Sequence, residues 1–523
     1  MAPLSSVSSS VENAPAAMKE RLQRLQRHLQ HGLIERDVPV RLALLAMLAG
    51  EHLLLIGPPG TAKSELARRL RGVFRGGQYF ERLLTKFSVP EELFGPLSIK
   101  ALEEDRYERL TGSYLPSASI AFIDEIFKAN SAILNALLTL LNEREFDNGA
   151  QRVKTPLAAV IGASNELPEG EELDALYDRF LIRYEIGPVS DEGFHELLQL
   201  DDTPSPAPAE ADLLSADDLD AVQAAARELP LSEDVYYLLG GLRDFLREKG
   251  IPVSDRRWRK VVKLLQVAAW GNGQQQVQVW DCWLLQHCLW HLPRQREPIL
   301  DWYQSHLGTD AVVNPERLRR LIGVWRQTLE QERNDKRQLA NERGERLYVD
   351  NQGQLTTLSG REYSAAEGGE PLYLAPPDQA DRSNAGQGYR REELQAQFFD
   401  DHYQQCHVDG KWVRLSEYTA NPENRLMRHE DFAPHTEPVR YSEQHIRERV
   451  EATQDLLDAI ARHKQVLAAK LDAIGADLSD HLWLDPAFAA PARENLEQSL
   501  SVIESLEGQI RDLQEGFRQL PRL

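Results

Sequence analysis

The sequence predicts an α/β fold: a parallel-sheet domain, then a smaller all-α unit, then long helices that carry a β-rich insert. Short apolar runs alternate with helical periodicity through about the first 200 residues, which is typical of a parallel sheet covered on both faces. Near the C-terminus apolar residues recur with 4-3 spacing, which predicts two long helices that pair antiparallel. A chain of 523 residues is also too long for one compact core. We therefore expect several domains.

Composition changes along the chain and divides it into parts. Ser, Pro and Ala predominate at the start, and the run DDTPSPAPAEAD reads as a linker. The expected parts are a disordered N-terminus (1–15), an α/β core (16–200), an all-α lid (201–305), a long-helix bundle (306–335 and 442–523) and a β-rich or partly disordered insert (336–441).

The α/β core is expected to begin with two helices, over residues 17–31 and 40–48, followed by the strand HLLLIG. Buried strands are expected at 120–123 and 157–163, on either side of a helix over 131–142. A strand, a glycine loop and a helix in this order provide the setting that a phosphate-binding loop requires.

The balance of charge and the cysteine content restrict the class of protein. A net charge of −22 argues against a general nucleic-acid binder and favours protein partners. Three cysteines do not make a disulfide framework and fit a reducing compartment. No apolar run reaches the length of about 18 residues that a membrane helix needs, and the N-terminus lacks a signal-peptide core. We expect a cytoplasmic protein that is not an integral membrane protein.

The stretch GPPGTAKSE lies one residue away from the phosphate-loop pattern, because Ala62 stands where a second glycine is usual. Alanine costs little there if φ is negative. Lys63 is expected to reach the β- and γ-phosphates of ATP, and the Ser64 hydroxyl to coordinate Mg²⁺. The alternative is an ordinary strand–turn–helix. The predicted nucleotide-binding residues are Gly57, Pro58, Pro59, Gly60, Thr61, Ala62, Lys63, Ser64 and Glu65.

Two adjacent carboxylates end the apolar strand in SIAFIDEIFK. Asp124 at the strand end is expected to hold the Mg²⁺ shell, and Glu125 to act as the general base toward water. The alternative, a helix start with two solvated acids, is weak because four apolar residues directly precede the pair. Asn165 ends a third strand, AAVIGASN, and is expected to orient the attacking water or to contact the γ-phosphate.

Arginines supply the remaining candidates. Arg179 and Arg183 lie four apart on a predicted helix in ALYDRFLIRYEI, where an arginine at a subunit edge reaches a neighbour's γ-phosphate. The alternative is an intramolecular ion pair with Asp178 or Glu185. VSDRRWRK opens a helix of the lid, from which one of its paired arginines is expected to fold over the nucleotide.

In order and spacing, GPPGTAKS, AFIDEI, ASNELP and LYDRFLIR resemble the Walker A, Walker B, sensor 1 and arginine-finger segments of an AAA+ ATPase. KFSVPEELFGPLSIKALEEDRYERLTGSYLPSA and LLNEREFDNG further resemble the MoxR group, in which alanine commonly precedes the Walker A lysine. The layout of the tail is similar to the regulatory ATPase variant (RavA) subgroup.

The resemblance implies a role for each matched residue. It makes Lys63 and Ser64 the phosphate and Mg²⁺ ligands, Asp124 the Mg²⁺ carboxylate and Glu125 the base. It makes Asn165 the sensor 1 residue. It also makes Arg179 the preferred arginine finger with Arg183 as alternate, and Arg256 the sensor 2 residue.

The resemblance also implies ATP and Mg²⁺ as cofactors and a homo-hexameric ring. Its implied partners are a protein with a von Willebrand factor A (vWA) domain and, through the tail insert, an inducible lysine decarboxylase. We therefore expect an ATP-hydrolysing, chaperone-like oligomer that remodels or activates a partner protein. The alternative is a nucleotide-gated scaffold that assembles with ATP but hydrolyses it negligibly. A nucleic-acid motor is disfavoured by the acidic balance.

Two further segments allow simpler interpretations. Cys282, Cys288, His287 and His291 suggest a metal site, but WDCWLLQHCLWHL is so apolar that a buried lid helix is favoured. Residues 331–523 are expected to form a partner-docking arm that adds nothing to the ATP site, so deleting them should leave turnover largely intact.

Overall fold

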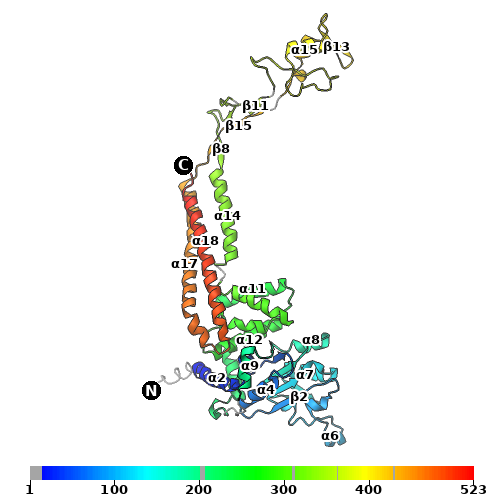
Figure 1. The fold of residues 1–523 in the computed structure, drawn as a ribbon, viewed down its shortest axis with the longest axis vertical. Helices are drawn as coiled ribbons and strands as arrows, with labels where there is room; N and C mark the ends of the chain where they lie inside the picture. Colours follow the sequence, from blue (N-terminus) through cyan, green and yellow to red (C-terminus); the bar gives the residue numbers. More distant parts are fainter. Residues whose placement is uncertain (1–13, 201–206, 309–312, 351, 362, 428–429) are drawn as a thin grey trace. The chain divides into compact units, whose positions relative to one another are not determined.

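The computed structural model describes residues 14–200, 207–308, 313–350, 352–361, 363–427 and 430–523 (Figure 1). They form two compact units. The first comprises Met1–Arg319 and Leu457–Gly508, and the second comprises Arg320–Leu456 and Gln509–Leu523. Most of the N-terminal segment expected to be disordered lies outside the described residues, although helix α2 already begins at Ala14.

A five-stranded parallel sheet forms the centre of the first unit, in the order β2-β3-β6-β1-β7. Strands β1 and β6 are buried along their whole length, because helices cover the sheet on both faces. The two sequence-predicted inner strands are confirmed to within two residues at each end. The strands are β1 (Leu53–Ile56), β2 (Tyr79–Leu83), β3 (Ile120–Asp124), β6 (Ala159–Ser164) and β7 (Ile182–Glu185).

Helix α3 packs against β1, β6 and β7, and α4 packs against β3. Almost every side chain of α3 is buried, and Gly50 ends this helix in the left-handed conformation that favours glycine. Two short strands, β4 (Glu145–Asn148) and β5 (Gln151–Lys154), form an antiparallel hairpin. The helices of this domain are α2 (Ala14–Gln30), α3 (Asp37–Ala49), α4 (Lys63–Gly72), α5 (Pro90–Phe94), α6 (Ile99–Glu103), α7 (Ser131–Glu143), α8 (Glu171–Tyr177) and α9 (Asp191–Leu198).

The predicted all-α lid is present in the same unit, and a serine caps the N-terminus of each of its first three helices. The sequence-predicted helix around WDCWLLQHCLWHL is a buried 3₁₀ segment, Asp281–His287, and not an α-helix. His291 lies outside it, and the described residues contain no cluster of three metal-ligating side chains. The lid helices are α10 (Ala216–Ala226), α11 (Glu233–Glu248), α12 (Asp255–Gly271) and α13 (Arg296–Ser305).

Two long helices near the C-terminus, α17 (Glu443–Ser479) and α18 (Ala489–Arg518), are antiparallel as predicted (Figure 1). Lys464 of α17 lies 3.0 Å from Glu507 of α18. Residues at 4-3 spacing on their facing sides are mostly buried, while Val450, Leu471 and Leu500 are half-buried.

The turn between α17 and α18 is embedded in the first unit. Trp483, only 1% exposed, donates from Nε1 to the carbonyl of Ala268 on α12 at 2.8 Å. His481 lies 3.2 Å from Asp281, and Gln26 of α2 donates to the carbonyl of Leu482 at 3.0 Å. The sequence predicts a separate long-helix domain that includes residues 457–508. This prediction is wrong for these residues, because they belong to the first unit and the turn between the two helices packs into the core of that unit.

The second unit contains helix α14 (Pro315–Asn334) from residue 320 on, and the insert. The insert is rich in short strands, as predicted, and a small core that includes Phe399 and Tyr418 lies beside two short helices. Its elements are β8 (Lys336–Gln338), β9 (Tyr348–Val349), β10 (Leu355–Thr356), β11 (Gly360–Arg361), α15 (Arg391–Phe398), β12 (Gln405–Val408), β13 (Lys411–Arg414), α16 (Leu415–Ala420), β14 (Glu430–Asp431), β15 (Ala433–Pro434) and β16 (Thr436–Pro438). None of the described helices has the length and apolar character needed to cross a membrane.

Candidate active site

The phosphate-loop sequence joins the end of β1 to the start of α4, where the N-terminus of a helix favours an anion. Gly57 donates from its N–H to the carbonyl of Ser164 on β6 at 2.9 Å. A Cβ on Gly57 would lie 1.9 Å from the carbonyl oxygen of Ile186, so a larger residue does not fit. Thr61 Oγ1 donates to the carbonyl of Pro58 at 3.0 Å and closes the loop on itself.

Ala62 does not have the negative φ at which alanine would cost little conformational energy in this loop. Its φ is 64°, in the left-handed region. An L-residue there costs about 1 kcal/mol more than in the right-handed region. The loop holds Ala62 in this conformation directly before the first turn of α4.

Arg36, just before α3, supports the loop from behind and is a residue that sequence reasoning missed. It is 7% exposed, and its guanidinium donates to the carbonyl of Thr61 at 3.2 Å and to that of Gly187 at 2.8 Å. No motif surrounds it, so only the folded chain reveals the role.

Lys63, Asp124 and Glu125 come together at the carboxyl edge of the sheet. Burial lowers the pKa of Lys63, and the nearby charges of Asp124 and Glu125 act in the opposite direction. The Lys63 ammonium donates to the carbonyls of Gly57 and Pro58 at 2.8 and 2.7 Å. The side chain is therefore held inside the loop, within the field of both carboxylates.

The two carboxylates are oriented by the end of β3. Glu125 has φ of 52°, and its N–H donates to Asp124 Oδ1 at 3.0 Å. This left-handed residue leads from β3 into the short 3₁₀ segment Ile126–Lys128. Ser64, in the first turn of α4, and Asp124 offer the oxygen ligands that Mg²⁺ prefers.

A pocket of about 380 Å³ lies beside Glu125, and Lys128, Asn130 and Ser164 help to line it. Lys128 Nζ lies 3.2 Å from Glu125 Oε2. Asn165 follows Ser164, which pairs with Ile56 in the sheet, so the chain places Asn165 beside the start of the phosphate loop. The predicted Walker A, Walker B and sensor 1 segments thus meet at one edge.

Arg183 is not on a helix, which corrects the sequence prediction. Helix α8 ends at Tyr177, and Arg183 lies on strand β7 with 0% exposure. It donates to the carbonyls of Trp290 and, at 3.1 Å, of Tyr177, and its Cζ lies 3.7 Å from the centroid of the Tyr177 ring. Burial lowers the pKa of Arg183 to about 9. Its guanidinium is buried inside the chain and cannot contact a nucleotide on a second subunit.

Arg179 lies in the turn between α8 and β7, and its guanidinium is only partly satisfied by hydrogen bonds and ion pairs within the chain. Its side chain is 21% exposed and lies 3.8 Å from Asp178. Burial, followed by the charge of nearby Arg256, lowers the pKa of Arg179. Its Nε is buried without a hydrogen-bond partner.

Arg179 and Arg256 therefore lie near each other, at the seam between the α/β core and the lid. Arg256 itself is exposed on the first turn of α12. Among the residues that the structure describes, none that lines the pocket beside Glu125 comes from the α8–β7 turn or from the lid. Neither Arg179 nor Arg256 of the same chain therefore lines the pocket beside Glu125.

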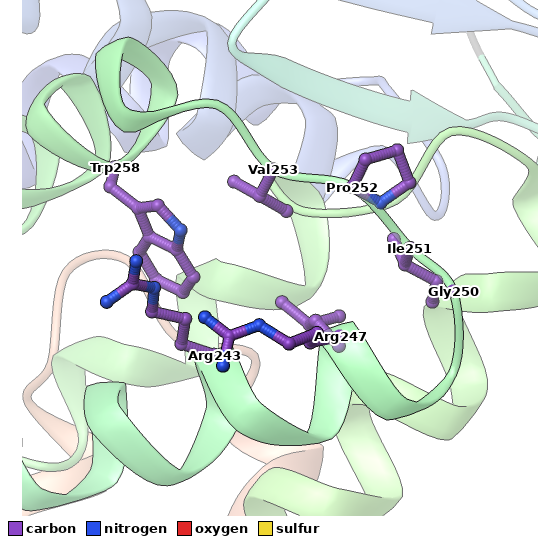
Figure 2. A pocket seen from close by; sticks show the side chains of 8 residues that line it. Arg243, Arg247, Gly250, Ile251, Pro252, Val253 and Trp258 are labelled. Atoms are coloured by element: carbon purple, nitrogen blue, oxygen red, sulfur yellow. The ribbon is translucent and has the colours of Figure 1, made fainter.

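A second pocket, of about 400 Å³, lies within the lid and was not predicted. It is lined by Arg243, Arg247, Trp258 and the turn 250–253, among others. Figure 2 shows Arg243 and Arg247 on one helix, with Trp258 beside Arg243. No sequence motif marks these residues, because the pocket forms only where α11 meets the start of α12.

Comparison with known proteins locates two matched regions, both within the first unit. The family model for the MoxR domain in MoxR–vWA–β-propeller ternary systems matches residues 20–224, and the model for an AAA lid domain matches residues 234–303. Two uncharacterised proteins of Methanocaldococcus jannaschii are similar. One is 42% identical over 272 residues, or 52% of this chain and 70% of that protein. The other is 41% identical over 274 residues, or 52% and 72%.

The chaperone MoxR1 of Mycobacterium tuberculosis is 27% identical over 216 residues, which cover 40% of this chain and 55% of MoxR1. None of these matches tests the narrower resemblance to the regulatory ATPase variant subgroup, which stays a prediction.

Proposed function

Because this chain belongs to the MoxR group of AAA+ ATPases, we propose that it hydrolyses ATP with Mg²⁺ and thereby remodels or activates a partner protein, as a chaperone-like enzyme. The observation that carries this proposal is the meeting of Lys63, Asp124 and Glu125 at the carboxyl edge of the sheet. An ammonium, a metal-binding carboxylate and a second carboxylate are the groups that phosphoryl transfer to water needs.

Each residue has a proposed part. The backbone N–H groups of residues 57–65 and the Lys63 ammonium bind the phosphates, while Ser64 and Asp124 hold Mg²⁺. The bound metal supplies charge neutralisation to the β- and γ-phosphates. Glu125 accepts a proton from the attacking water, and Asn165 orients that water. Arg256, exposed at the start of α12, is the proposed sensor 2 residue.

We assign the arginine-finger part to Arg179, acting on ATP bound to a neighbouring subunit. Its side chain is 21% exposed, whereas Arg183 is fully buried and donates to the carbonyls of Trp290 and Tyr177 inside the chain. Arg179 also does not line the pocket beside its own Glu125. These observations favour a site shared between subunits, and we propose a homo-hexameric ring in the cytoplasm.

The family description names ternary systems of MoxR, vWA and β-propeller components. We propose a partner with a vWA domain, in keeping with that description. An inducible lysine decarboxylase bound through the insert, implied by the narrower resemblance, stays a prediction.

One observation favours the alternative of a nucleotide-gated scaffold. Lys128 lies 3.2 Å from Glu125, so the proposed base is already engaged by a cation. If ATP binding did not release this pair, the protein would assemble without hydrolysing.

Steady-state ATP turnover of the purified protein and of Glu125→Gln, with size measurement of both in ATP, separates the two proposals. The matched control is Glu248→Gln, an exposed position at the end of α11. Turnover in wild type and Glu248→Gln but not in Glu125→Gln, with the same assembly for all three, supports the enzyme. Equal inertness of wild type and Glu125→Gln, with ATP-dependent assembly, supports the scaffold.

A further inference from the structure

Arg257, on the lid helix α12, uses all of its hydrogen-bond donors on the α/β core and the lid. Its side chain is 3% exposed. Five N–H groups make five hydrogen bonds, to the side chain and carbonyl of Asp178 and to the carbonyls of Phe180, Leu181 and Cys288. A planar guanidinium can satisfy such a set of acceptors, and an ammonium cannot.

Four of these five acceptors belong to the turn that carries Arg179. The Arg257 bonds to Asp178 measure 3.1 Å to the carboxylate and 3.3 Å to the carbonyl, and those to Phe180 and Leu181 measure 3.1 and 2.9 Å. The chain on both sides of Arg179 is therefore bound to the lid. Any movement of α12 is expected to move this turn.

The same contact decides which cation Asp178 neutralises. Asp178 has its Oδ1 3.1 Å from Arg257, whereas its Oδ2 lies 3.8 Å from Arg179. Ion-pair energy falls with distance, and only the nearer pair forms a hydrogen bond. Arg179 therefore keeps positive charge that an incoming anion can neutralise.

We propose that Arg257 is a positioning residue for the arginine finger. It clamps the 177–181 turn to the lid and keeps Asp178 from pairing closely with Arg179, so that Arg179 meets the γ-phosphate of ATP on the neighbouring subunit. This role rests on the proposed function, in which Arg179 acts across the subunit boundary. Arg257 therefore connects the position of Arg179, which acts on the neighbouring subunit, to the position of the lid in its own subunit.

Two variants weaken the clamp in different ways. Arg257→Lys keeps the charge but loses most of the five bonds. Asp178→Asn keeps the size of the side chain but removes its negative charge, so that its bond to the Arg257 guanidinium becomes weaker. Each is expected to reduce kcat about 10- to 100-fold, below the full effect of losing an arginine finger. The KM for ATP is expected to change less than threefold, since the subunit's own phosphate loop is unchanged. Arg259→Lys, at an exposed position of the same helix, is the matched control and should keep wild-type kinetics.

Mixed rings distinguish positioning in trans from a general structural role. Each variant is co-expressed with Glu125→Gln on a second tag, and rings that carry both tags are isolated. A variant subunit retains Glu125, and its Glu125→Gln neighbour retains a well-placed Arg179. In an equal random mixture about a quarter of the interfaces combine both intact parts. Mixed rings of Arg257→Lys or Asp178→Asn should regain up to about that share of wild-type turnover.

The reference mixture is Arg179→Ala with Glu125→Gln. If the reference regains turnover but neither clamp variant does, or if both clamp variants keep wild-type kcat, the positioning role is overturned. If the reference itself stays inactive while wild type turns over, the trans site of the proposed function is wrong, and the positioning role falls with it. Should Arg257→Lys fail to fold by circular dichroism, Asp178→Asn carries the same test.

Discussion

Asp178 Oδ1 accepts a hydrogen bond from Arg257 Nη1 at 3.1 Å, and this contact joins the α/β core to the lid within one chain. Asp178 belongs to the turn after α8, and Arg257 to the first turn of α12. The pair thus connects the residue next to the proposed arginine finger with the helix that carries the proposed sensor 2 residue.

Lys63→Ala should abolish ATP binding, because the Lys63 ammonium is the cation held inside the phosphate loop. At an ATP concentration about 100-fold above Kd, binding stabilises the folded state of wild type by about 2.7 kcal/mol. We expect the ATP-dependent rise in the thermal midpoint to disappear in Lys63→Ala and to persist in Lys154→Ala, an exposed control. An unchanged rise in Lys63→Ala would contradict the phosphate-loop assignment.

Ala62→Gly should leave stability nearly unchanged, although glycine usually destabilises. Relief of the left-handed φ of 64° contributes about 1 kcal/mol, and the added freedom of the unfolded chain costs roughly 0.5–1 kcal/mol. Ala67→Gly, within the following helix α4 and 0% exposed, has no strain to relieve and should lose roughly 1–2 kcal/mol. Urea unfolding of both variants measures the contrast, and equal losses would argue against the left-handed conformation.

Trp483→Ala should destabilise the first unit by roughly 3–5 kcal/mol, because it leaves a cavity between the α17–α18 turn and α12. Trp483→Phe keeps most of the packing and loses the bond to Ala268, for a loss of about 1 kcal/mol from that bond. Val466→Ala, at a position 48% exposed on α17, is the control. Urea unfolding followed by circular dichroism ranks the three, and a loss no larger for Trp483→Ala than for Val466→Ala would contradict the embedded turn.

Acidification should destabilise the protein through buried histidines that stay neutral when folded. Burial lowers the pKa of His287 to about 3 and that of His52 well below its usual value. The unfolded chain takes up these protons first as the pH falls below about 6.5, so each histidine removes about 1.4 kcal/mol of stability per pH unit there. The loss attributed to His287 ends near pH 3.

His287→Leu tests this prediction, since leucine is apolar and does not titrate. Between pH 6.5 and 4.5 the variant should lose stability less steeply than wild type, by about 1.4 kcal/mol per pH unit. The control is His31→Leu, at an exposed position. Thermal midpoints across this pH range supply the slopes. Identical slopes for wild type and His287→Leu would show that His287 does not contribute.

Excision of the insert should separate partner binding from catalysis. Strand β8 pairs with β16, and the N–H of Leu339 donates to the carbonyl of His435 at 2.9 Å. The two ends of the segment 340–434 therefore lie next to each other. Replacing them with Asn-Gly, a two-residue hairpin turn, keeps the long helices intact. We expect ATP turnover to stay within about twofold of wild type, and capture of the protein partner that docks on the insert to be lost.

This excision replaces the broader deletion of residues 331–523 suggested by the sequence. That deletion also removes Trp483 and His481, whose contacts complete the core of the ATP-bearing unit. We expect it to abolish turnover through unfolding. Turnover within twofold of wild type after the broader deletion would contradict the embedded turn.

The sequence by itself determined the parallel sheet, the lid and the local chemistry of the proposed site. Apolar runs that end in GPPGTAKS, in Asp124 and in Asn165 suffice for this, because parallel strands present their carboxyl ends at one edge. The family resemblance rests on the same local segments. Local patterns predict such features well, since each depends on a few neighbouring residues.

Tertiary structure alone decided where the arginines and the C-terminal turn lie and what they contact. Arg179 and Arg183 are four residues apart in sequence. Arg179 is partly exposed in the turn after α8, whereas Arg183 is buried on β7. Arg36 and Arg257 became recognisable only through the carbonyls that surround them. The embedding of Trp483 beside Ala268 joins residues 215 positions apart. Such contacts depend on which surfaces meet in the folded chain, and no local periodicity records that.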